Sequence, residues 1–366
     1  MKIPMANLKL EYDFIKKEIQ AEIEKVLEST AFIRGKEINN FNEKAEKFLK
    51  VKNHIACGNG TDALQIALMA LDIQPGDEVI TTPFTFIATA EVIALLKAKP
   101  VFVDIDSDTL LMDTDKIEDA ITDKTFAILP VHLFGQMVDM EAVMKIAKRH
   151  NLKVIEDTAQ AFGATQNGKS AGTFGDIGTI SYFPSKNLGA YGDAGGMITD
   201  NDELAEKIEM ITNHGQKRKY EHHIIGVNSR MDTIQSAILN VKMQYIDEWL
   251  EKRNRAGELY KKLLDSSIKT QKTLEGNFHT YHQFAIRVKK RDELKEYLTD
   301  KGIASAIYYP ISLNDQVAFK NNSKGNETPN SREVAKDILA LPISHFISED
   351  EIHEVAEAVN DFVRKT

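Results

Sequence analysis

Short apolar runs alternate with amphipathic stretches through the first two-thirds of the chain. The runs predict buried strands, and the stretches between them carry apolar residues at helical spacing. The predicted strands are EVITT (78–82), PVFVDID (100–106), FAILPVH (126–132), KVIEDTA (153–159), IGTISYF (177–183) and GGMIT (195–199). The predicted helices are DALQIALMALD (62–72), EAVMKIAKRH (141–150) and DELAEKIEMIT (202–212). Continuous apolar strands that alternate with helices predict an α/β fold with a large, mostly parallel sheet covered on both faces.

The pattern changes after residue 242. A long charged helix is predicted at 245–264, a strand at 281–288, a helix near 291–301, two further helices toward the C-terminus and a polar loop at 321–331. We therefore predict a large α/β domain over residues 13–242 and a smaller α+β domain over residues 243–366. Residues 1–12 are a candidate addition to the smaller domain.

Charge and composition narrow the class of protein. The 366 residues carry a formal net charge of −9, which argues against nucleic acid as the main partner because phosphate binding needs a basic surface. The most apolar region is interrupted by Glu91, Lys97 and Pro100, so no membrane span is predicted. Cys57 is the single cysteine, which excludes an intramolecular disulfide and a cysteine-based zinc site. The start of the chain lacks the pattern of a secretion signal, and we expect a cytoplasmic protein.

The stretch CGNGTDALQIAL (57–68) places Gly58 and Gly60 just before a predicted helix. Backbone N–H groups at the start of a helix bind anions well, and the Thr61 hydroxyl adds a donor. The alternative is an ordinary glycine turn in which Thr61 or Asp62 caps the helix. The stretch is neither a Walker loop nor a dinucleotide fingerprint, because the required lysine and glycine spacings are missing.

Two acidic residues, Glu156 and Asp157, end the predicted strand in VIEDTAQAFGA (154–164). In open α/β sheets ligands collect at the carboxyl ends of strands, so Asp157 is a candidate to hold a cation, a metal or a protonated ring nitrogen. The alternative is an Asp that caps a turn. We predict no metal site, because no cluster of His, Asp and Glu has ligand spacing and the adjacent His222 and His223 point apart.

One lysine, Lys186, stands among small residues in FPSKNLGAYGDAGG (183–196). Most lysines are solvated surface residues, which is the alternative here. A lysine that bonds covalently to a carbonyl must be deprotonated at neutral pH, and burial lowers its pKa for that purpose. Pyridoxal phosphate accounts for all three stretches. It needs Lys186 for a Schiff base, Asp157 for its ring nitrogen, and Gly60–Thr61 with Ser181 for its phosphate.

A longer ordered set of motifs resembles one family. The motifs are GNGTDAL, TPFTFIATAE, PVHLFGQ, IEDTAQAFGA, SYFPSKNLGAYGDAGG, HGQKRKYEHHIIGVNSRMDTIQSAIL and IYYPISL. Together they resemble the nucleotide-sugar aminotransferases of the DegT/StrS type, over nearly the whole chain. The resemblance implies a fold type I, aspartate-aminotransferase-like enzyme that binds pyridoxal phosphate and forms a homodimer with shared active sites. Some relatives have histidine in place of the lysine and catalyse dehydration, so Lys186 favours transamination.

The resemblance also implies roles for single residues. Lys186 matches the lysine that carries the cofactor, and Asp157 matches the acid that keeps the pyridine nitrogen protonated. Phe86 matches the aromatic residue that stacks on the ring, and Gln160 the residue near the ring hydroxyl. Further cofactor contacts are implied at Gly60, Thr61, Asp62 and Ser181, and at Asn228 from the other subunit.

Substrate contacts are implied at Arg230, His214, Tyr308 and Tyr309, with the segment FIRGKE (32–37) as a further candidate. Three structural alternatives stay open among the matched positions. Phe86 is also typical of a core residue and Asn228 of a turn. Arg230 is also placed to pair with Asp232.

The residues within these motifs most resemble the branch of the family that aminates a 3-keto nucleotide sugar. We expect transfer from L-glutamate to C-3 of UDP-2-acetamido-2-deoxy-3-oxo-glucuronate, for surface polysaccharides such as lipopolysaccharide O-antigen. The alternative substrate is a dTDP-3-keto-6-deoxyhexose. An alternative of another class is a catalytically inactive regulator or binding protein, since a fold alone does not prove an activity.

Overall fold

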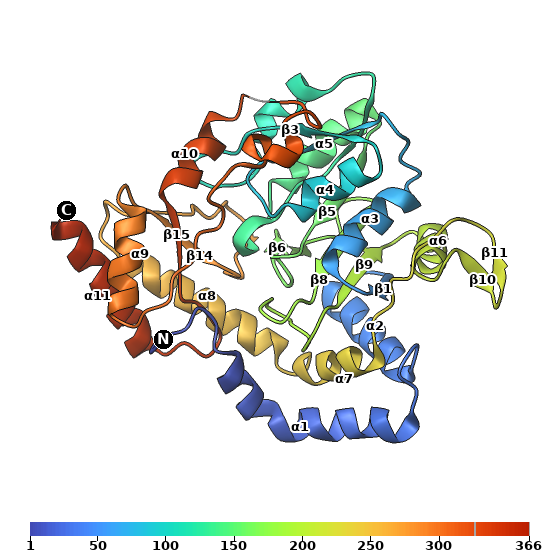
Figure 1. The fold of residues 1–366 in the computed structure, drawn as a ribbon, viewed down its shortest axis with the longest axis horizontal. Helices are drawn as coiled ribbons and strands as arrows, with labels where there is room; N and C mark the ends of the chain where they lie inside the picture. Colours follow the sequence, from blue (N-terminus) through green and yellow to red (C-terminus); the bar gives the residue numbers. More distant parts are fainter. Residues whose placement is uncertain (326, 366) are drawn as a thin grey trace.

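The structure is a computed structural model that describes residues 1–325 and 327–365. A seven-stranded sheet forms the centre of the larger part of the molecule (Figure 1). The strand order is β1-β9-β8-β5-β4-β2-β3. All neighbours pair in parallel except β9, which is antiparallel to both β8 and β1, so the prediction of a mostly parallel sheet is confirmed. The strands are β1 (Asn53–Cys57), β2 (Glu78–Thr81), β3 (Lys99–Phe102), β4 (Thr125–Ile128), β5 (Lys153–Asp157), β8 (Ile177–Ser181) and β9 (Gly195–Thr199).

Eleven α-helices are present in the described residues. They are α1 (Leu8–Ser29), α2 (Lys36–Leu49), α3 (Gly60–Ala70), α4 (Ala88–Leu95), α5 (Met140–His150), α6 (Asp202–Thr212), α7 (Thr233–Lys242), α8 (Ile246–Leu263), α9 (Arg291–Asp300), α10 (Pro329–Asp337) and α11 (Glu349–Lys365). Each helix predicted from the sequence is confirmed within a few residues. The prediction missed α1, α2, α4 and α7. Four residues of α1 are buried, one of them Glu11, so its apolar stripe is too narrow to be read as helical spacing.

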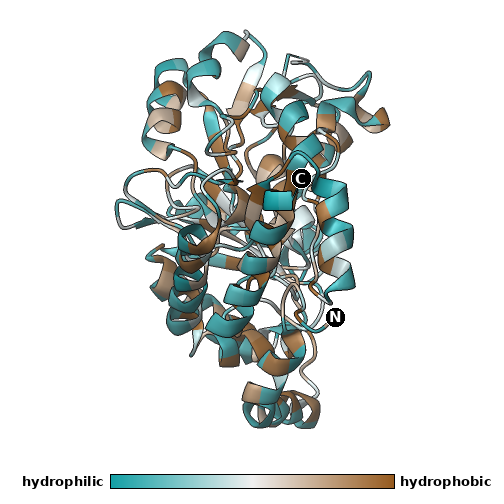
Figure 2. Ribbon diagram, turned by 90° about the vertical axis from the view of Figure 1, so that its left-hand side faces the viewer, coloured by the Kyte–Doolittle hydropathy of each residue, from teal (hydrophilic) through white to brown (hydrophobic). Residues whose placement is uncertain are grey.

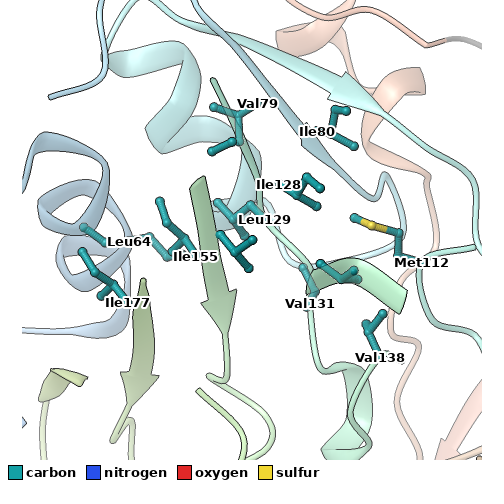
Figure 3. Packing of buried hydrophobic residues seen from close by; sticks show 14 of the residues in the cluster. Leu64, Val79, Ile80, Met112, Ile128, Leu129, Val131, Val138, Ile155 and Ile177 are labelled. Atoms are coloured by element: carbon teal, nitrogen blue, oxygen red, sulfur yellow. The ribbon is translucent and has the colours of Figure 1, made fainter. Parts of the chain in front are cut away.

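The main hydrophobic core lies between this sheet and the helices on its two faces. Figure 3 shows Leu64 of α3 beside Ile155 of β5 and Ile177 of β8, with Val79 of β2 and Ile128 of β4 farther along the sheet. Every residue of β2 is buried, so its two central residues, Val79 and Ile80, are both apolar although they point to opposite faces of the sheet. In Figure 2 the hydrophobic colour gathers inside, and the helix surfaces toward the viewer are largely hydrophilic.

A second, smaller sheet lies in the C-terminal part of the chain. It consists of β12 (Lys269–Thr270), β14 (Phe284–Arg287) and β15 (Ile338–Leu341), all antiparallel. Helices α8, α9 and α11 pack with it around a separate hydrophobic cluster. Ile3 belongs to this cluster and pairs with Ile303. On these grounds we propose residues 243–366 as a small domain joined by the first residues of the chain.

Shorter elements complete the fold. The short strands are β6 (Thr165–Gln166), β7 (Lys169–Ser170), β10 (Gln216–Arg218), β11 (Glu221–His222) and β13 (Asn277–Phe278), and the 3-10 helices are η1 (Thr114–Lys116), η2 (Glu118–Ala120), η3 (Leu133–Gly135), η4 (Leu313–Asp315) and η5 (Val317–Phe319). The hairpin of β10 and β11 projects away from the sheet, on the right of Figure 1. Within the described ranges, no helix combines the length and apolar character needed to cross a bilayer.

The prediction of a loop at 321–331 is wrong in part. The Phe102 N–H donates to the Lys324 carbonyl at 2.9 Å and the Lys324 N–H donates to the Pro100 carbonyl at 3.0 Å, so Lys324 pairs with the outer edge of β3. Helix α10 then begins at Pro329, where a proline fits the first turn. The segment was predicted as a loop because its composition is polar. The pairing of Lys324 at the sheet edge uses backbone groups alone and leaves no apolar pattern in the sequence. Residue 326 lies outside the described residues.

Candidate functional site

A cavity of about 640 Å³ opens where the sheet strands reach their carboxyl ends. Residues that follow β1, β2, β4, β5 and β8 line it, together with residues of the C-terminal part. Pockets of this size hold small molecules and cofactors. The structure brings nine of the predicted site residues to this cavity: Gly60, Thr61, Phe86, Asp157, Gln160, Ser181, Lys186, Tyr308 and Tyr309.

Asp157 is the last residue of β5 and its carboxylate is held from two sides. The Thr89 hydroxyl donates to Oδ2 at 2.8 Å and the Ala159 N–H donates to Oδ1 at 3.1 Å. Burial raises the pKa of Asp157, while these hydrogen bonds and the charge of Lys186 act in the opposite direction. The site thus presents an oriented, buried carboxylate that gains from a cationic partner in the cavity.

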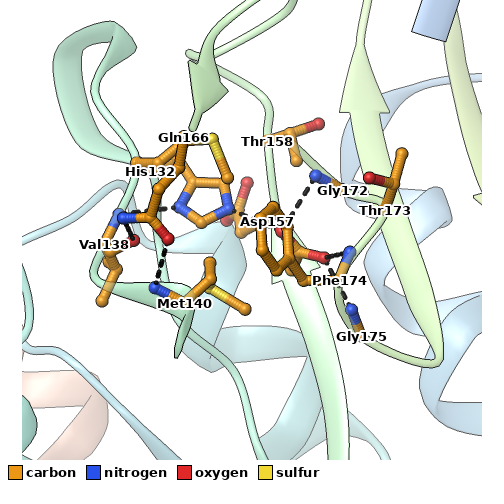
Figure 4. Close-up of polar contacts among 12 residues, drawn as sticks. His132, Val138, Met140, Asp157, Thr158, Gln166, Gly172, Thr173, Phe174 and Gly175 are labelled. Atoms are coloured by element: carbon orange, nitrogen blue, oxygen red, sulfur yellow. Dashed lines mark hydrogen bonds and ion pairs between the residues drawn. The ribbon is translucent and has the colours of Figure 1, made fainter. Parts of the chain in front are cut away.

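The neighbouring Glu156 serves a different purpose, because successive residues of a strand point to opposite faces. Its side chain is fully buried and accepts N–H groups from Gly172 at 2.9 Å, Phe174 at 2.7 Å and Gly175 at 2.8 Å (Figure 4). His132 Nε2 donates to it at 2.9 Å. Since His132 Nδ1 accepts the Val138 N–H at 3.2 Å, the proton on this ring lies on Nε2. Glu156 therefore fastens a loop to β5 behind Asp157.

Lys186 follows β8 in a tight turn. Its N–H donates to the Phe183 carbonyl at 2.8 Å, and the Ala190 N–H donates to the Tyr182 carbonyl at 2.8 Å. Burial lowers the pKa of Lys186 to about 8, and the charge of Asp157 opposes this shift. A side chain at Gly189 would come within 2.4 Å of the Pro184 carbonyl oxygen. This glycine is thus needed for the turn to close on its own backbone.

The start of α3 forms the wall beside Ser181. The Asn59 side chain caps the helix by accepting the Asp62 N–H at 2.8 Å, so the cap is Asn59 rather than Thr61 or Asp62. A side chain at Gly60 would come within 2.7 Å of Ser181 Cβ, so glycine is required for this close approach. The first N–H groups of α3 and the hydroxyls of Thr61 and Ser181 thus lie together, an arrangement that suits a phosphate.

Aromatic and amide side chains form another part of the wall. Phe86 is 54% exposed, and its ring lies 6.4 Å from that of Tyr309. Gln160 accepts the Phe134 N–H at 3.0 Å and donates from Nε2 to the Tyr309 hydroxyl at 3.0 Å. The first bond fixes the amide so that its NH₂ group faces Tyr309. The exposed Phe86 is not a core residue and is available for stacking.

Five candidates lie outside this cavity's lining. Asp62 lies in the first turn of α3, where its backbone N–H donates to Asn59 Oδ1. His214 and Asn228 stand at the base of the projecting hairpin, where Asn213 pairs with Asn228 and the His214 N–H donates to the Val227 carbonyl at 2.8 Å. Arg230 donates to Asn213 Oδ1 at 2.9 Å. The segment 32–37 meets the start of α7, where the Thr233 N–H donates to the Phe32 carbonyl at 2.9 Å.

Thr89 and His282 are among the cavity residues that were not singled out from the sequence. Thr89 lies in the motif FTFIAT, but its contact with Asp157 needs α4, which was not predicted. His282 lies just before β14, and its buried Nδ1 has no hydrogen-bond partner in the described structure. Nothing in the spacing around His282 marks it, because the fold brings it to the cavity from far along the chain.

The residues present fit pyridoxal phosphate. The buried carboxylate of Asp157 suits a protonated ring nitrogen, and the glycine-lined start of α3 suits a phosphate. Lys186 stands between them with a lowered pKa, as a lysine that bonds an aldehyde requires. Among the described residues, no group of three or more His, Cys, Asp or Glu side chains is placed to hold a metal ion.

Comparison with known proteins gives one family and close relatives. Residues 13–360 match the DegT/DnrJ/EryC1/StrS aminotransferase family. A protein of Geobacillus stearothermophilus described as a pleiotropic regulatory protein is 47% identical, over 100% of this chain and 99% of that protein. A UDP-N-acetyl-3-dehydro-α-D-glucosamine 3-aminotransferase of Acidithiobacillus ferrooxidans is 41% identical, over 98% and 97%. A UDP-2-acetamido-2-deoxy-3-oxo-D-glucuronate aminotransferase of Pseudomonas aeruginosa is 40% identical, over 98% and 100%.

Solved structures agree with the fold. DesV of S. venezuelae, crystallised in complex with a ketimine intermediate, superposes with a TM-score of 0.97 at 33% identity, over 100% of this chain and 99% of that chain. NtdA of Bacillus subtilis, with the bound cofactor PMP, superposes with a TM-score of 0.89 at 34% identity, over 95% and 82%. The predicted α/β architecture is therefore shared over the whole chain.

Proposed function

The chain belongs to the DegT/DnrJ/EryC1/StrS aminotransferase family, and on this premise we propose that it moves the amino group of L-glutamate to C-3 of a UDP-linked 3-keto sugar. The family and its solved members make it an enzyme that depends on pyridoxal phosphate. One observation carries the proposal: Lys186 and Asp157 line the same cavity, and burial shifts their pKa values in opposite directions. Such opposed pairs are typical of acid–base sites.

The residues divide the work of transamination among them. When bound, pyridoxal phosphate supplies an electron sink for the negative charge that develops at the substrate carbon. Lys186 Nζ takes a proton from Cα of glutamate and later returns one, as general base and acid. Asp157 holds the proton on the ring nitrogen. Gly60, Thr61 and Ser181 hold the phosphate, and Phe86 covers the ring.

The nature of the sugar rests on the relatives and on Arg230. Two relatives at 40–41% identity act on UDP-linked 3-keto sugars, which differ in whether the sugar carries a carboxylate. We favour UDP-2-acetamido-2-deoxy-3-oxo-glucuronate, because a guanidinium binds a carboxylate through two hydrogen bonds and Arg230 is available at the base of the hairpin. A dTDP-3-keto-6-deoxyhexose is the alternative. The product serves surface polysaccharide biosynthesis in this proposal.

A homodimer completes the proposed site. His214, Asn228 and Arg230 lie outside the cavity of their own chain, at the base of a hairpin that projects from it (Figure 1). Helix α1 exposes the large apolar side chains of Leu8, Leu10, Phe14 and Leu27, a composition that favours contact with another protein surface. In the dimer that we propose, these hairpin residues reach the cavity of the second copy.

The regulator alternative is given weight by the Geobacillus relative, which is described as a regulatory protein. The described cavity nevertheless holds both Lys186 and Asp157, and a binding protein needs neither a lysine with a lowered pKa nor an oriented carboxylate. Conversion of the visible cofactor band on addition of L-glutamate alone distinguishes an enzyme from a regulator that only binds the cofactor.

Loading of cofactor-free protein with pyridoxal phosphate should accelerate as the pH rises through about 8. The reason is that burial lowers the pKa of Lys186 to about 8, and only the neutral amine attacks the aldehyde. Below that pH the rate constant should fall about tenfold per unit, as the neutral fraction falls. Stopped-flow absorbance measures this. A rate that keeps climbing to the pH where free lysine deprotonates would contradict a buried Lys186.

The choice of sugar is tested by kcat/KM for three acceptors: the UDP-linked 3-oxo-glucuronate, its uncharged 3-oxo-glucosamine counterpart, and a dTDP-3-keto-6-deoxyhexose. We expect the glucuronate to be preferred at least about tenfold, since the uncharged analogue leaves the guanidinium unpaired. Arg230→Gln should erase that preference and spare the uncharged sugar. Equal losses on all three acceptors would remove Arg230 from carboxylate recognition, and a preference for the dTDP sugar would overturn the proposed substrate.

A further inference from the structure

The loop that carries Lys186 is attached to α7 by side chains that are not among the described residues lining the cavity. Lys242, the last residue of α7, donates from Nζ to the Gly189 carbonyl at 2.5 Å. Two helical turns earlier in α7, Gln235 Oε1 accepts the Tyr191 N–H at 2.9 Å. Gly189 and Tyr191 follow Lys186 by three and five residues. Two side chains of one helix therefore hold the backbone of this loop.

Lys242 is unusual because its side chain is only 1% exposed. Lysine is rarely buried to this degree unless it is paired. Its ammonium forms an ion pair with Glu11 of α1 and lies 4.4 Å from the centre of the Tyr191 ring. Burial lowers the pKa of Lys242, and Glu11 opposes that shift. The N-terminal helix thus supplies the charge that keeps this lysine inside the protein.

His345 also lies against the ion pair of Lys242 and Glu11. His345 Nε2 lies 3.2 Å from Glu11, and its ring stacks on Trp249 of α8 with the ring centres 4.2 Å apart. Helices α1 and α7 also pack directly on each other, as Figure 1 shows at the bottom of the view. The contact between Lys242 and Gly189 is therefore surrounded by side chains of α1, α7 and α8 and by His345, which lies between β15 and α11.

A buried ion pair is weak evidence for stability, because removing two charges from water costs about as much as their attraction returns. Apolar residues at positions 11 and 242 together would fill the space without that cost. What an apolar residue would lack is a donor for the Gly189 carbonyl. The geometry thus gives Lys242 a purpose beyond the stability of the fold.

We propose that Lys242 is a positioning residue for Lys186, acting through its hydrogen bond to the Gly189 carbonyl, with Glu11 as its counter-charge. The inference rests on the proposed function only in that Lys186 carries the cofactor; it is independent of the sugar. A shift of about 1 Å in a reacting group costs on the order of a hundredfold in rate, so a fixed loop matters for catalysis.

The test compares three variants of the holoenzyme: Lys242→Met, Glu11→Gln and Lys44→Met. Lys44 is the matched control, because its ammonium also donates to a backbone carbonyl, that of Asn240 in α7 at 3.1 Å, but does not touch the loop. Three quantities are measured: the Tm, the amide hydrogen exchange of peptide 183–192, and the single-turnover rate of cofactor conversion by L-glutamate.

We expect Lys242→Met to raise exchange in peptide 183–192 and to slow the single turnover about tenfold or more. Glu11→Gln should lower the Tm while it keeps the turnover within about twofold, because the donor to Gly189 remains. Lys44→Met should change neither the exchange nor the rate. If Lys242→Met and Glu11→Gln give the same profile, or if Lys242→Met lowers only the Tm, the positioning role is overturned.

Lys242→Arg covers the case in which Lys242→Met does not fold. It keeps the charge beside Glu11, but a planar guanidinium does not reproduce the single point contact of an ammonium. Faster loop exchange and slower turnover at a preserved Tm support the proposal, and unchanged values overturn it. A protein with no visible cofactor band at all would instead refute the proposed function, so the two failures are distinct.

Discussion

Lys186→Ala should abolish the visible absorption band of the bound cofactor and lower the rate of the glutamate half-reaction by about 10⁴-fold. The substitution removes the amine that bonds the cofactor and the only base that we assign to the proton at Cα. The side chain faces the cavity, so its loss leaves the core and the Tm nearly unchanged. Absorbance spectra before and after addition of L-glutamate measure both effects.

The control for this variant is Lys186→Arg, which keeps the positive charge but not an amine that deprotonates. It should behave like Lys186→Ala if the lysine acts as nucleophile and base. A small amine such as methylamine should restore part of the rate to Lys186→Ala, since it fits the space that the side chain leaves. Retention of the band in Lys186→Ala, or full activity in Lys186→Arg, would show that another group carries the cofactor.

Asp157→Asn should lower kcat by about 10³-fold, the scale seen when a preorganised electrostatic contact is removed. The asparagine carbonyl oxygen still accepts the Ala159 N–H, and its NH₂ group donates to the Thr89 hydroxyl, which is able to donate to Thr85 instead, so the site keeps its shape. It does not carry the negative charge that holds a proton on the ring nitrogen. The cofactor band should persist with L-glutamate converting it only slowly, which rapid-scanning absorbance follows.

Glu156→Gln is the matched control, because it removes the adjacent charge on the opposite face of β5. The carboxylate accepts three backbone N–H groups and one from His132. We expect a loss of about 3 kcal/mol in the free energy of unfolding, because the NH₂ group of glutamine would face backbone N–H groups that are also donors. The turnover of the folded fraction should stay within a fewfold of wild type. A deficit in turnover equal to that of Asp157→Asn would place Glu156 in the chemistry as well.

The sheet and the centre of the site are predictable from the sequence because both have local signals. Buried parallel strands contain runs of adjacent apolar residues, and β2, β4 and β5 were found on that basis. Asp157 is the last residue of one such strand and Lys186 lies in the turn after another, so the topology brings them to one edge of the sheet. The family resemblance then added Phe86 and Gln160, which the structure also places at the cavity.

The remainder depends on contacts between distant parts of the chain, for which the sequence has no local signal. Helix α4 carries apolar residues on nearly all sides, so these residues show no helical stripe, and Thr89 was missed with the helix. Strand β1 begins with Asn53 and His54 and was too polar to be read as a buried strand. Lys242 resembles any lysine at the end of a helix, and only the fold shows it buried against Glu11 and Gly189.

The pairing of Lys324 with β3 has a consequence for solubility. An open sheet exposes unpaired N–H and C=O groups at its two outer strands, and such rows recruit strands from other molecules into aggregates. Here Lys324 pairs with the outer side of β3, and on the opposite outer strand the Glu46 side chain accepts the His54 N–H at 3.0 Å. During synthesis β3 emerges more than two hundred residues before Lys324. The outer edge of β3 therefore stays unpaired in the nascent chain until Lys324 has been synthesised. We expect truncations that remove Lys324 to aggregate more readily than the full chain.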